Sequence, residues 1–180
     1  MANKEHSDTT TKTTETKQTD IEINHSDGFF TETEQRIIEK YCHDAQYIYG
    51  EHDNSDQPYI TGMTHDIPET EFVYKLIAKT LYDRAEFTRD MRLYRMYVNH
   101  FAPSEGANFH SDGEGYTFLY YPHTQEYDLD EGGETQFLLD GNIFGIRAIS
   151  NRMAVFDGQI PHRATPFRTQ HRFTIAIKYE

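Results

Sequence analysis

The chain has 180 residues, a formal net charge of −13, ten histidines and one cysteine. A single cysteine excludes an internal disulfide and indicates a reducing compartment. No long apolar run occurs anywhere in the sequence, so we expect a cytoplasmic protein without a membrane span. The negative charge disfavours tight binding to the phosphate backbone of nucleic acids.

The first segment has a different composition from the rest. Residues 1–27 are rich in Thr, Lys and Glu, and such a segment buries too little apolar surface to offset the entropy lost on ordering. We therefore expect residues 1–27 to form a disordered polar tail. Residues 28–180 should form a single folded domain, with order beginning at Phe29.

Two helices are predicted in the first half of this domain. Thr31 and Glu34 have the spacing of a capping box, and apolar residues at helical spacing extend this helix to about His43. Pro68 opens a second helix, whose apolar face continues to about Phe87.

The remaining elements are predicted to be strands. Alternating or continuous apolar runs bounded by Gly- and Asn-rich turns occur at residues 46–50, 58–63, 91–101, 116–121, 134–139, 143–150, 153–158 and 172–179. Many short strands with such turns are typical of a sandwich or barrel. We expect a mainly β protein of the α+β class, a jelly roll buttressed by its N-terminal helices.

The tripeptide His-Ser-Asp occurs three times, at residues 6–8, 25–27 and 110–112. The first two copies fall in the predicted tail or at its edge, where nothing holds two ligands in a fixed geometry. The third copy lies in the strand-rich region. There His110 and Asp112 point to the same side, because side chains alternate along extended chain.

A third ligand is available at His162, which follows a predicted strand. Two imidazoles and one carboxylate with open positions form the facial triad of non-haem Fe(II) oxygenases. Taken alone, His110 is also compatible with a turn cap, and His162 with a surface or core histidine. His123 and His171 have no partner at a suitable spacing, and we expect both on the surface.

The last predicted strand, residues 172–179, has two different faces. One face carries Phe173, Ile175, Ile177 and Tyr179, and the other carries Arg172, Thr174, Ala176 and Lys178. The apolar face can pack on helices, and the face that begins with Arg172 would line a polar cavity. There a guanidinium can bind a carboxylate through two hydrogen bonds, although a structural salt bridge or a solvated edge strand remains the alternative.

His110-x-Asp112, His162 and then Arg172 together resemble the 2-oxoglutarate- and Fe(II)-dependent dioxygenases. The segment "EGGETQF" (131–137) and the segment "HRATPFRTQHRFTIAI" are most similar to the prolyl-4-hydroxylase-like branch. The resemblance covers about residues 91–179.

This resemblance implies a double-stranded β-helix with Fe(II) held by His110, Asp112 and His162. It implies 2-oxoglutarate and O2 as cosubstrates, Arg172 as the partner of the 2-oxoglutarate carboxylate, and ascorbate as a candidate reductant. Thr174 would assist Arg172. The products would be a hydroxylated substrate, succinate and CO2.

One departure from the family pattern and one second resemblance bear on the substrate. Prolyl hydroxylases usually have Lys where Arg172 stands. The segment "VNHFAP" is similar to a segment of the alkylated-base demethylases, in which an Asn and a Tyr contact the cosubstrate. Asn99 matches that Asn, Phe101 replaces the Tyr, and Tyr97 shares the strand face. Lys178 stands where those enzymes have a second Arg.

The function expected from these features is hydroxylation of a protein or peptide side chain such as proline. The alternatives are the same chemistry on a nucleobase or small metabolite, or a non-catalytic jelly roll that binds a partner. If the substrate is a nucleobase in a nucleic acid, the arginines between Arg147 and Arg172 would contact its phosphates. Specificity should lie in loops 51–58 and 122–131.

Overall fold

A computed structural model describes residues 23–51 and 61–180 of the chain. The helices are α1 (Glu32–Asp44), α2 (Phe72–Arg84) and the 3₁₀ turns η1 (Glu86–Asp90) and η2 (Leu129–Glu131). The strands are β1 (Asn24–Ser26), β2 (Ile48–Glu51), β3 (Thr61–Asp66), β4 (Leu93–Phe101), β5 (Tyr116–Tyr121), β6 (Thr135–Leu139), β7 (Asn142–Ile146), β8 (Arg152–Asp157), β9 (His162–Ala164) and β10 (Arg172–Tyr179). No helix among the described residues is long and apolar enough to cross a membrane.

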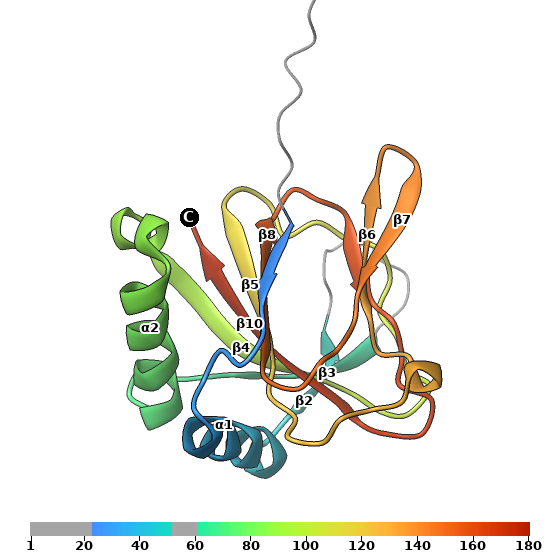
Figure 1. Ribbon diagram of the computed structural model, residues 1–180, viewed down its shortest axis with the longest axis horizontal. Helices are drawn as coiled ribbons and strands as arrows, with labels where there is room; N and C mark the ends of the chain where they lie inside the picture. The colour runs from blue at the N-terminus through green and yellow to red at the C-terminus, as the bar shows by residue number, and fades with distance from the viewer. Residues whose placement is uncertain (1–22, 52–60) are drawn as a thin grey trace, which may run out of the picture.

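The strands form two antiparallel sheets. The larger sheet has seven strands in the order β1-β8-β5-β10-β4-β3-β2, and the smaller has three in the order β7-β6-β9. Figure 1 shows both helices to one side of the larger sheet, with the smaller sheet on the other side. This is the predicted jelly roll buttressed by its N-terminal helices.

Two apolar clusters hold these layers together. The first joins helix residues such as Ile38, Ile77 and Leu81 to Ile175 and Ile177 of β10. The second lies between the sheets and is formed by Tyr97, Leu119, Tyr121, Phe137, Phe156, Ile160, Phe167 and Ala176, among others. The alternation of β10 therefore divides its side chains between the two layers, as the sequence pattern predicted.

The helix boundaries follow local hydrogen bonding. Thr31 and Glu34 form the predicted capping box, and α1 begins directly after Thr31. The second helix begins later than predicted, because the backbone N–H of Glu71 bonds the carbonyl of Pro68 in a separate turn. It also ends earlier, at Arg84, and the 3₁₀ turn η1 takes up the remainder of the predicted span.

Among the strands, the main differences from the expected elements are the following. Residues 24–26 form strand β1 on the edge of the larger sheet, paired with β8, so ordered chain begins before residue 28. Residues 162–164 form the short strand β9, which pairs with β6 and was not predicted. The predicted strand 143–150 ends at Ile146. Sequence period alone does not reveal pairing as short as three residues.

Candidate metal centre and its pocket

Backbone pairing brings the two histidines of the predicted triad together. His110 and His162 form an isolated antiparallel bridge in which each backbone N–H donates to the carbonyl of the other, at 3.0 and 2.8 Å. Two residues further on, the N–H of Asp112 donates to the carbonyl of Gly158 at 2.7 Å. The segment before β5 is thereby tied to the segment after β8.

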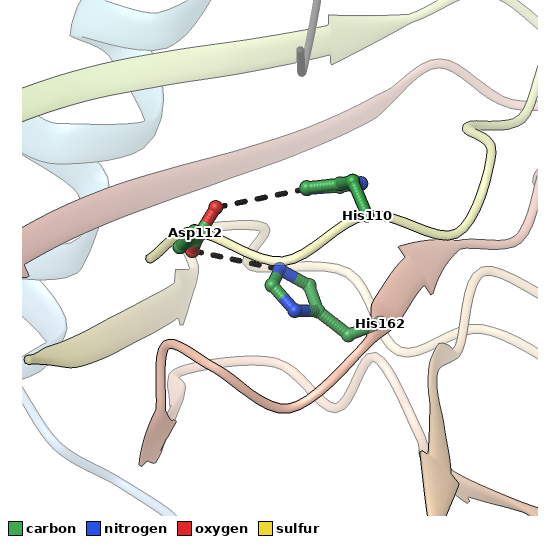
Figure 2. A group of neighbouring side chains, drawn as sticks. All are labelled: His110, Asp112 and His162. Atoms are coloured by element: carbon green, nitrogen blue, oxygen red, sulfur yellow. Dashed lines mark ion pairs between the residues drawn. The ribbon is translucent and has the colours of Figure 1, made fainter. Parts of the chain in front are cut away.

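The three side chains converge at one point (Figure 2). Their candidate ligand atoms all lie within 4.8 Å of one another. The Nε2 atom of His110 is 3.7 Å from Oδ1 of Asp112, and the Nε2 atom of His162 is 3.5 Å from Oδ2. Among the described residues, no other group of three or more His, Cys, Asp or Glu side chains has such a geometry.

Each ring is oriented by a backbone carbonyl. The Nδ1 atom of His110 lies 3.0 Å from the carbonyl oxygen of Asn108, and that of His162 lies 2.8 Å from the carbonyl oxygen of Ile160. Because a carbonyl oxygen only accepts, Nδ1 carries the proton and the Nε2 lone pair faces Asp112. Burial lowers the pKa of His162 to about 4, so this ring is a neutral ligand at neutral pH.

Asp112 is buried and accepts two short hydrogen bonds. Thr117 Oγ1 donates to Oδ2 at 2.6 Å, and Lys178 Nζ donates to Oδ1 at 2.6 Å. Burial alone would raise the pKa of Asp112, but His162, which is protonated only in the acid range where Asp112 titrates, the charge of Lys178 and the hydrogen bonds from Lys178 and Thr117 outweigh it and hold the pKa below its usual value. The carboxylate is therefore ionised, as a metal ligand must be.

The triad lies in a pocket that also contains the other predicted site residues. Its lining includes Tyr97, Asn99, Phe101, Ala107, His110, Asp112, Thr117, Leu119, Thr135, His162, Ala164, Arg172, Thr174 and Ala176. All seven predicted metal- and cosubstrate-binding residues are thus neighbours in space. They come from β4, β9, β10 and the loop before β5.

Arg172 is 2% exposed and is held by neutral groups. Its Nε donates to the carbonyl of Gly133 at 3.0 Å, Nη2 to Thr135 Oγ1 at 3.0 Å, and Nη1 to Thr174 Oγ1 at 3.5 Å. Burial lowers its pKa from the ordinary value. In the described part of the chain no carboxylate forms an ion pair with it, which suits a guanidinium whose anionic partner is a ligand.

Sequence reasoning missed several polar residues of this site. Thr117 and Thr135 had no assigned role, although the inward alternation of Thr117 with Leu119 on β5 was readable. Lys178 was placed on the correct face of β10 without a role. Its contact with Asp112 depends on the register of β10 in the sheet, and no sequence motif predicts that register.

The other two His-Ser-Asp copies behave differently. In the second copy, His25 and Ser26 lie on β1, and Asp27 accepts hydrogen bonds from Nε and Nη2 of Arg152 at 2.6 and 2.9 Å. This carboxylate is engaged in a structural ion pair. The first copy, residues 6–8, and loop residues 52–58 lie outside the described residues.

His123 was expected on the surface and is instead buried, with 8% exposure. Its ring lies against Tyr127 and Phe167, at centroid distances of 4.9 and 6.2 Å. His123 and Tyr127 belong to the loop that follows β5, and both rings pack against Phe167, which lies between β9 and β10. His171 is exposed, as expected.

Comparison with solved structures identifies the fold as the double-stranded β-helix of the 2-oxoglutarate- and Fe(II)-dependent oxygenases. A prolyl-4-hydroxylase from Pseudomonas putida superposes with a TM-score of 0.75 at 14% identity, covering 89% of this chain and 94% of that one. A prolyl hydroxylase from Trichoplax adhaerens, in complex with a hypoxia inducible factor peptide, has a TM-score of 0.68 at 14% identity, over 87% and 82% of the chains.

A third solved structure with this fold is HygX from Streptomyces hygroscopicus with nickel and 2-oxoglutarate bound. It has a TM-score of 0.69 at 10% identity, over 88% of this chain and 82% of that one. No protein-family model and no curated protein sequence matches this chain.

Proposed function

We propose that this protein is a 2-oxoglutarate- and Fe(II)-dependent dioxygenase that hydroxylates a second substrate. The observation that carries the proposal is the triad of His110, Asp112 and His162, whose ligand atoms lie within 4.8 Å of one another. This triad shares a pocket with the buried guanidinium of Arg172. 2-Oxoglutarate could chelate the metal through its oxo-acid end and bind the guanidinium through its other carboxylate, so the two positions suit this cosubstrate.

The metal would be held by the Nε2 atoms of His110 and His162 and by the Asp112 carboxylate. Fe(II) held by these residues would supply the electrons that activate O2 for oxidative decarboxylation of 2-oxoglutarate. The backbone carbonyls that accept from Nδ1 fix the ring orientations, so the ligands are arranged before the metal arrives. Ascorbate is the candidate reductant for maintaining the metal as Fe(II).

The far carboxylate of 2-oxoglutarate would bind Arg172, with Thr174 and Thr135 beside it. These hydroxyls already contact the guanidinium and fix its plane. Tyr97 or Asn99 on β4 would donate to the cosubstrate from the neighbouring strand. One O2 and one 2-oxoglutarate are consumed per C–H bond, which becomes C–OH, and succinate and CO2 are released.

The substrate we favour is a protein or peptide side chain such as proline. The similar proteins from Pseudomonas putida and Trichoplax adhaerens are prolyl hydroxylases, and the second is in complex with a peptide fragment. A net charge of −13 disfavours a nucleic-acid substrate. A small metabolite is the second candidate, because a further structure of HygX has hygromycin B bound.

Succinate formation tests the proposal. Wild-type protein should produce succinate from 2-oxoglutarate with Fe(II) and ascorbate in the presence of a substrate from a panel of peptides, free amino acids and small metabolites. Asp112→Ala should abolish it, because the variant lacks the one anionic metal ligand. Asp27→Ala is the control, because Asp27 belongs to another copy of the same tripeptide, and this variant should still form succinate.

A wild-type protein that binds no divalent metal, or makes no succinate with the whole panel, would contradict the proposal and favour a non-catalytic binding protein. Circular dichroism of both variants shows whether the strands remain folded. Activity only on nucleobases would favour the demethylase-like alternative.

A further inference from the structure

Lys178 lies beside the candidate metal position. It is on β10, its side chain is 11% exposed, and Nζ is 2.6 Å from Oδ1 of Asp112. The ammonium group also lies 5.4 Å from the centre of the Tyr97 ring. An ammonium group in this position is the countercharge of the only carboxylate in the triad.

The strand register makes this contact specific. Lys178 is directly opposite Thr117 in the antiparallel pair of β10 and β5. Thr117 donates to one oxygen of Asp112 and Lys178 to the other. Two neighbouring strands therefore hold the carboxylate from the same face of the sheet, and a one-residue register shift of either strand would turn that strand's side chain toward the helix layer.

A divalent metal would compete with this arrangement. It needs the charge of Asp112, and the carboxylate is already paired with an ammonium at hydrogen-bond distance. A divalent cation bound there would lie close to a second cation in a partly buried site, where charges are poorly screened. A bound metal would therefore either displace the ammonium group of Lys178 from Asp112 or be repelled by it, and both effects lower the metal affinity.

We propose that Lys178 is the resident cation of the metal-free site and lowers its affinity for a divalent metal until 2-oxoglutarate is also bound. This inference rests on the proposed function. The cosubstrate is a dianion, and it compensates the charge that the metal adds beside Lys178 and Arg172. Lys178 thus makes metal and cosubstrate binding more strongly cooperative than chelation alone would.

The sign of the expected effect distinguishes this role from a structural one. Removal of a residue that merely supports Asp112 would weaken metal binding, because the ligand would lose its orientation. Removal of a competing cation strengthens metal binding and at the same time destabilises the metal-free protein, whose Asp112 loses its partner.

The test uses the full-length protein and Mn²⁺, a divalent ion that prefers oxygen-rich sites over surface histidines. Calorimetry measures the Mn²⁺ affinity of wild type and of Lys178→Met, each with and without 2-oxoglutarate. Without the oxo-acid, Lys178→Met should bind Mn²⁺ more tightly, on the order of tenfold, within the usual range for coupling between groups. The affinity gain caused by 2-oxoglutarate should shrink by a similar factor.

Two control variants show whether the change in Mn²⁺ affinity comes from loss of the charge at residue 178. Lys178→Arg keeps the charge and should retain the wild-type affinity. Lys79→Met removes a lysine from the exposed surface of α2, where its side chain is 75% exposed, and should also leave the affinity unchanged. The melting temperature of metal-free Lys178→Met should be lower than that of wild type, and Mn²⁺ should restore it.

Equal or weaker Mn²⁺ binding by Lys178→Met, with wild type binding normally, overturns the role of Lys178 and leaves the proposed function intact. If neither protein binds Mn²⁺ with or without 2-oxoglutarate, the proposed function fails and this inference fails with it.

Discussion

At the scale of single residues, Arg172 has the most unusual environment. A guanidinium with 2% exposure normally has a carboxylate partner, yet the hydrogen bonds described for Arg172 go to a carbonyl and two hydroxyls. Those neutral groups fix the plane of the guanidinium and supply no countercharge at hydrogen-bond distance. A dianionic cosubstrate is a suitable partner for it.

Replacing Arg172 should therefore affect cosubstrate binding more than any other single change on β10. Arg172→Leu leaves the bound carboxylate without a countercharge, at a cost of about 3–5 kcal/mol by comparison with broken buried ion pairs. The 2-oxoglutarate affinity measured by calorimetry should fall on the order of a hundredfold or more. The exposed Arg168 provides the control, and Arg168→Leu should bind normally. Wild-type affinity in folded Arg172→Leu would refute the assignment.

His123 is a second residue whose environment has a measurable consequence. It is enclosed by aromatic side chains, and its Nε2 atom has no hydrogen-bond partner among the residues that the structure describes. Desolvation lowers its pKa from 6.5 to about 4. The folded protein therefore keeps this ring neutral at a pH where an unfolded chain would protonate it.

This shift predicts an acid-sensitive contribution to stability. Because the folded-state pKa is lower, the unfolded chain binds more protons between about pH 4 and 6.5, and stability falls as pH decreases through that window. His123→Gln should reduce the loss of unfolding free energy between pH 7.5 and pH 5 by about 2 kcal/mol. Urea unfolding at both pH values measures it. Identical pH dependence in the two proteins would be inconsistent with a buried neutral ring.

At the scale of elements, the segment that precedes β6 helps to hold Arg172 in place. Gly132 and Gly133 both have positive φ, at 83° and 81°. The N–H of Gly133 donates to the carbonyl of Pro166, and its own carbonyl accepts from Arg172. A side chain at Gly133 would overlap the ring of Phe167. Without a side chain, the backbone of Gly133 can lie against the ring of Phe167 while its carbonyl accepts from Arg172.

Two glycines on either end of β6 allow this effect to be separated from backbone strain. Gly133→Ala and Gly141→Ala both place a side chain at positive φ, at a strain cost of about 1 kcal/mol each. A side chain at Gly141 meets nothing within 4 Å, so only Gly133→Ala should carry an additional overpacking cost of about 1–3 kcal/mol. Thermal unfolding compares them. Equal losses of stability would show that Phe167 moves aside freely.

At the scale of the whole molecule, the layers determine where the site can form. The helices cover one face of the larger sheet, so polar side chains of β4, β5 and β10 can gather only on the face toward the smaller sheet (Figure 1). His110 and Asp112 lie on the segment between β4 and β5 of the larger sheet, and His162 is the first residue of β9 in the smaller sheet, so the metal position lies between the two sheets. Strand β1 lies at the far edge of the larger sheet and contributes nothing to this pocket.

Truncation at two positions tests this separation. Deleting residues 1–22 should leave both the melting temperature and the Mn²⁺ affinity unchanged. Deleting residues 1–27 also removes β1 and the Asp27–Arg152 ion pair, so it should lower the melting temperature while the folded protein still binds Mn²⁺. Loss of metal binding with the shorter deletion would instead assign a ligand to the first His-Ser-Asp copy.

The sequence by itself determined the features that depend on local periodicity. The alternation of β10 separated Ile175 and Ile177 from Arg172 and Thr174, and the capping box at Thr31 marked the start of α1. The spacing of His110 and Asp112 identified two candidate ligands. These signals are readable because side-chain direction follows from the backbone period of each element.

Only the tertiary structure decided which side chains meet across strands. The contact of Lys178 with Asp112, the burial of His123 and the pairing of β1 depend on segments far apart in the chain. The second His-Ser-Asp copy shows the same point, because Arg152 and not a metal binds its carboxylate. Register and burial are set by packing between distant segments, and no local pattern encodes them.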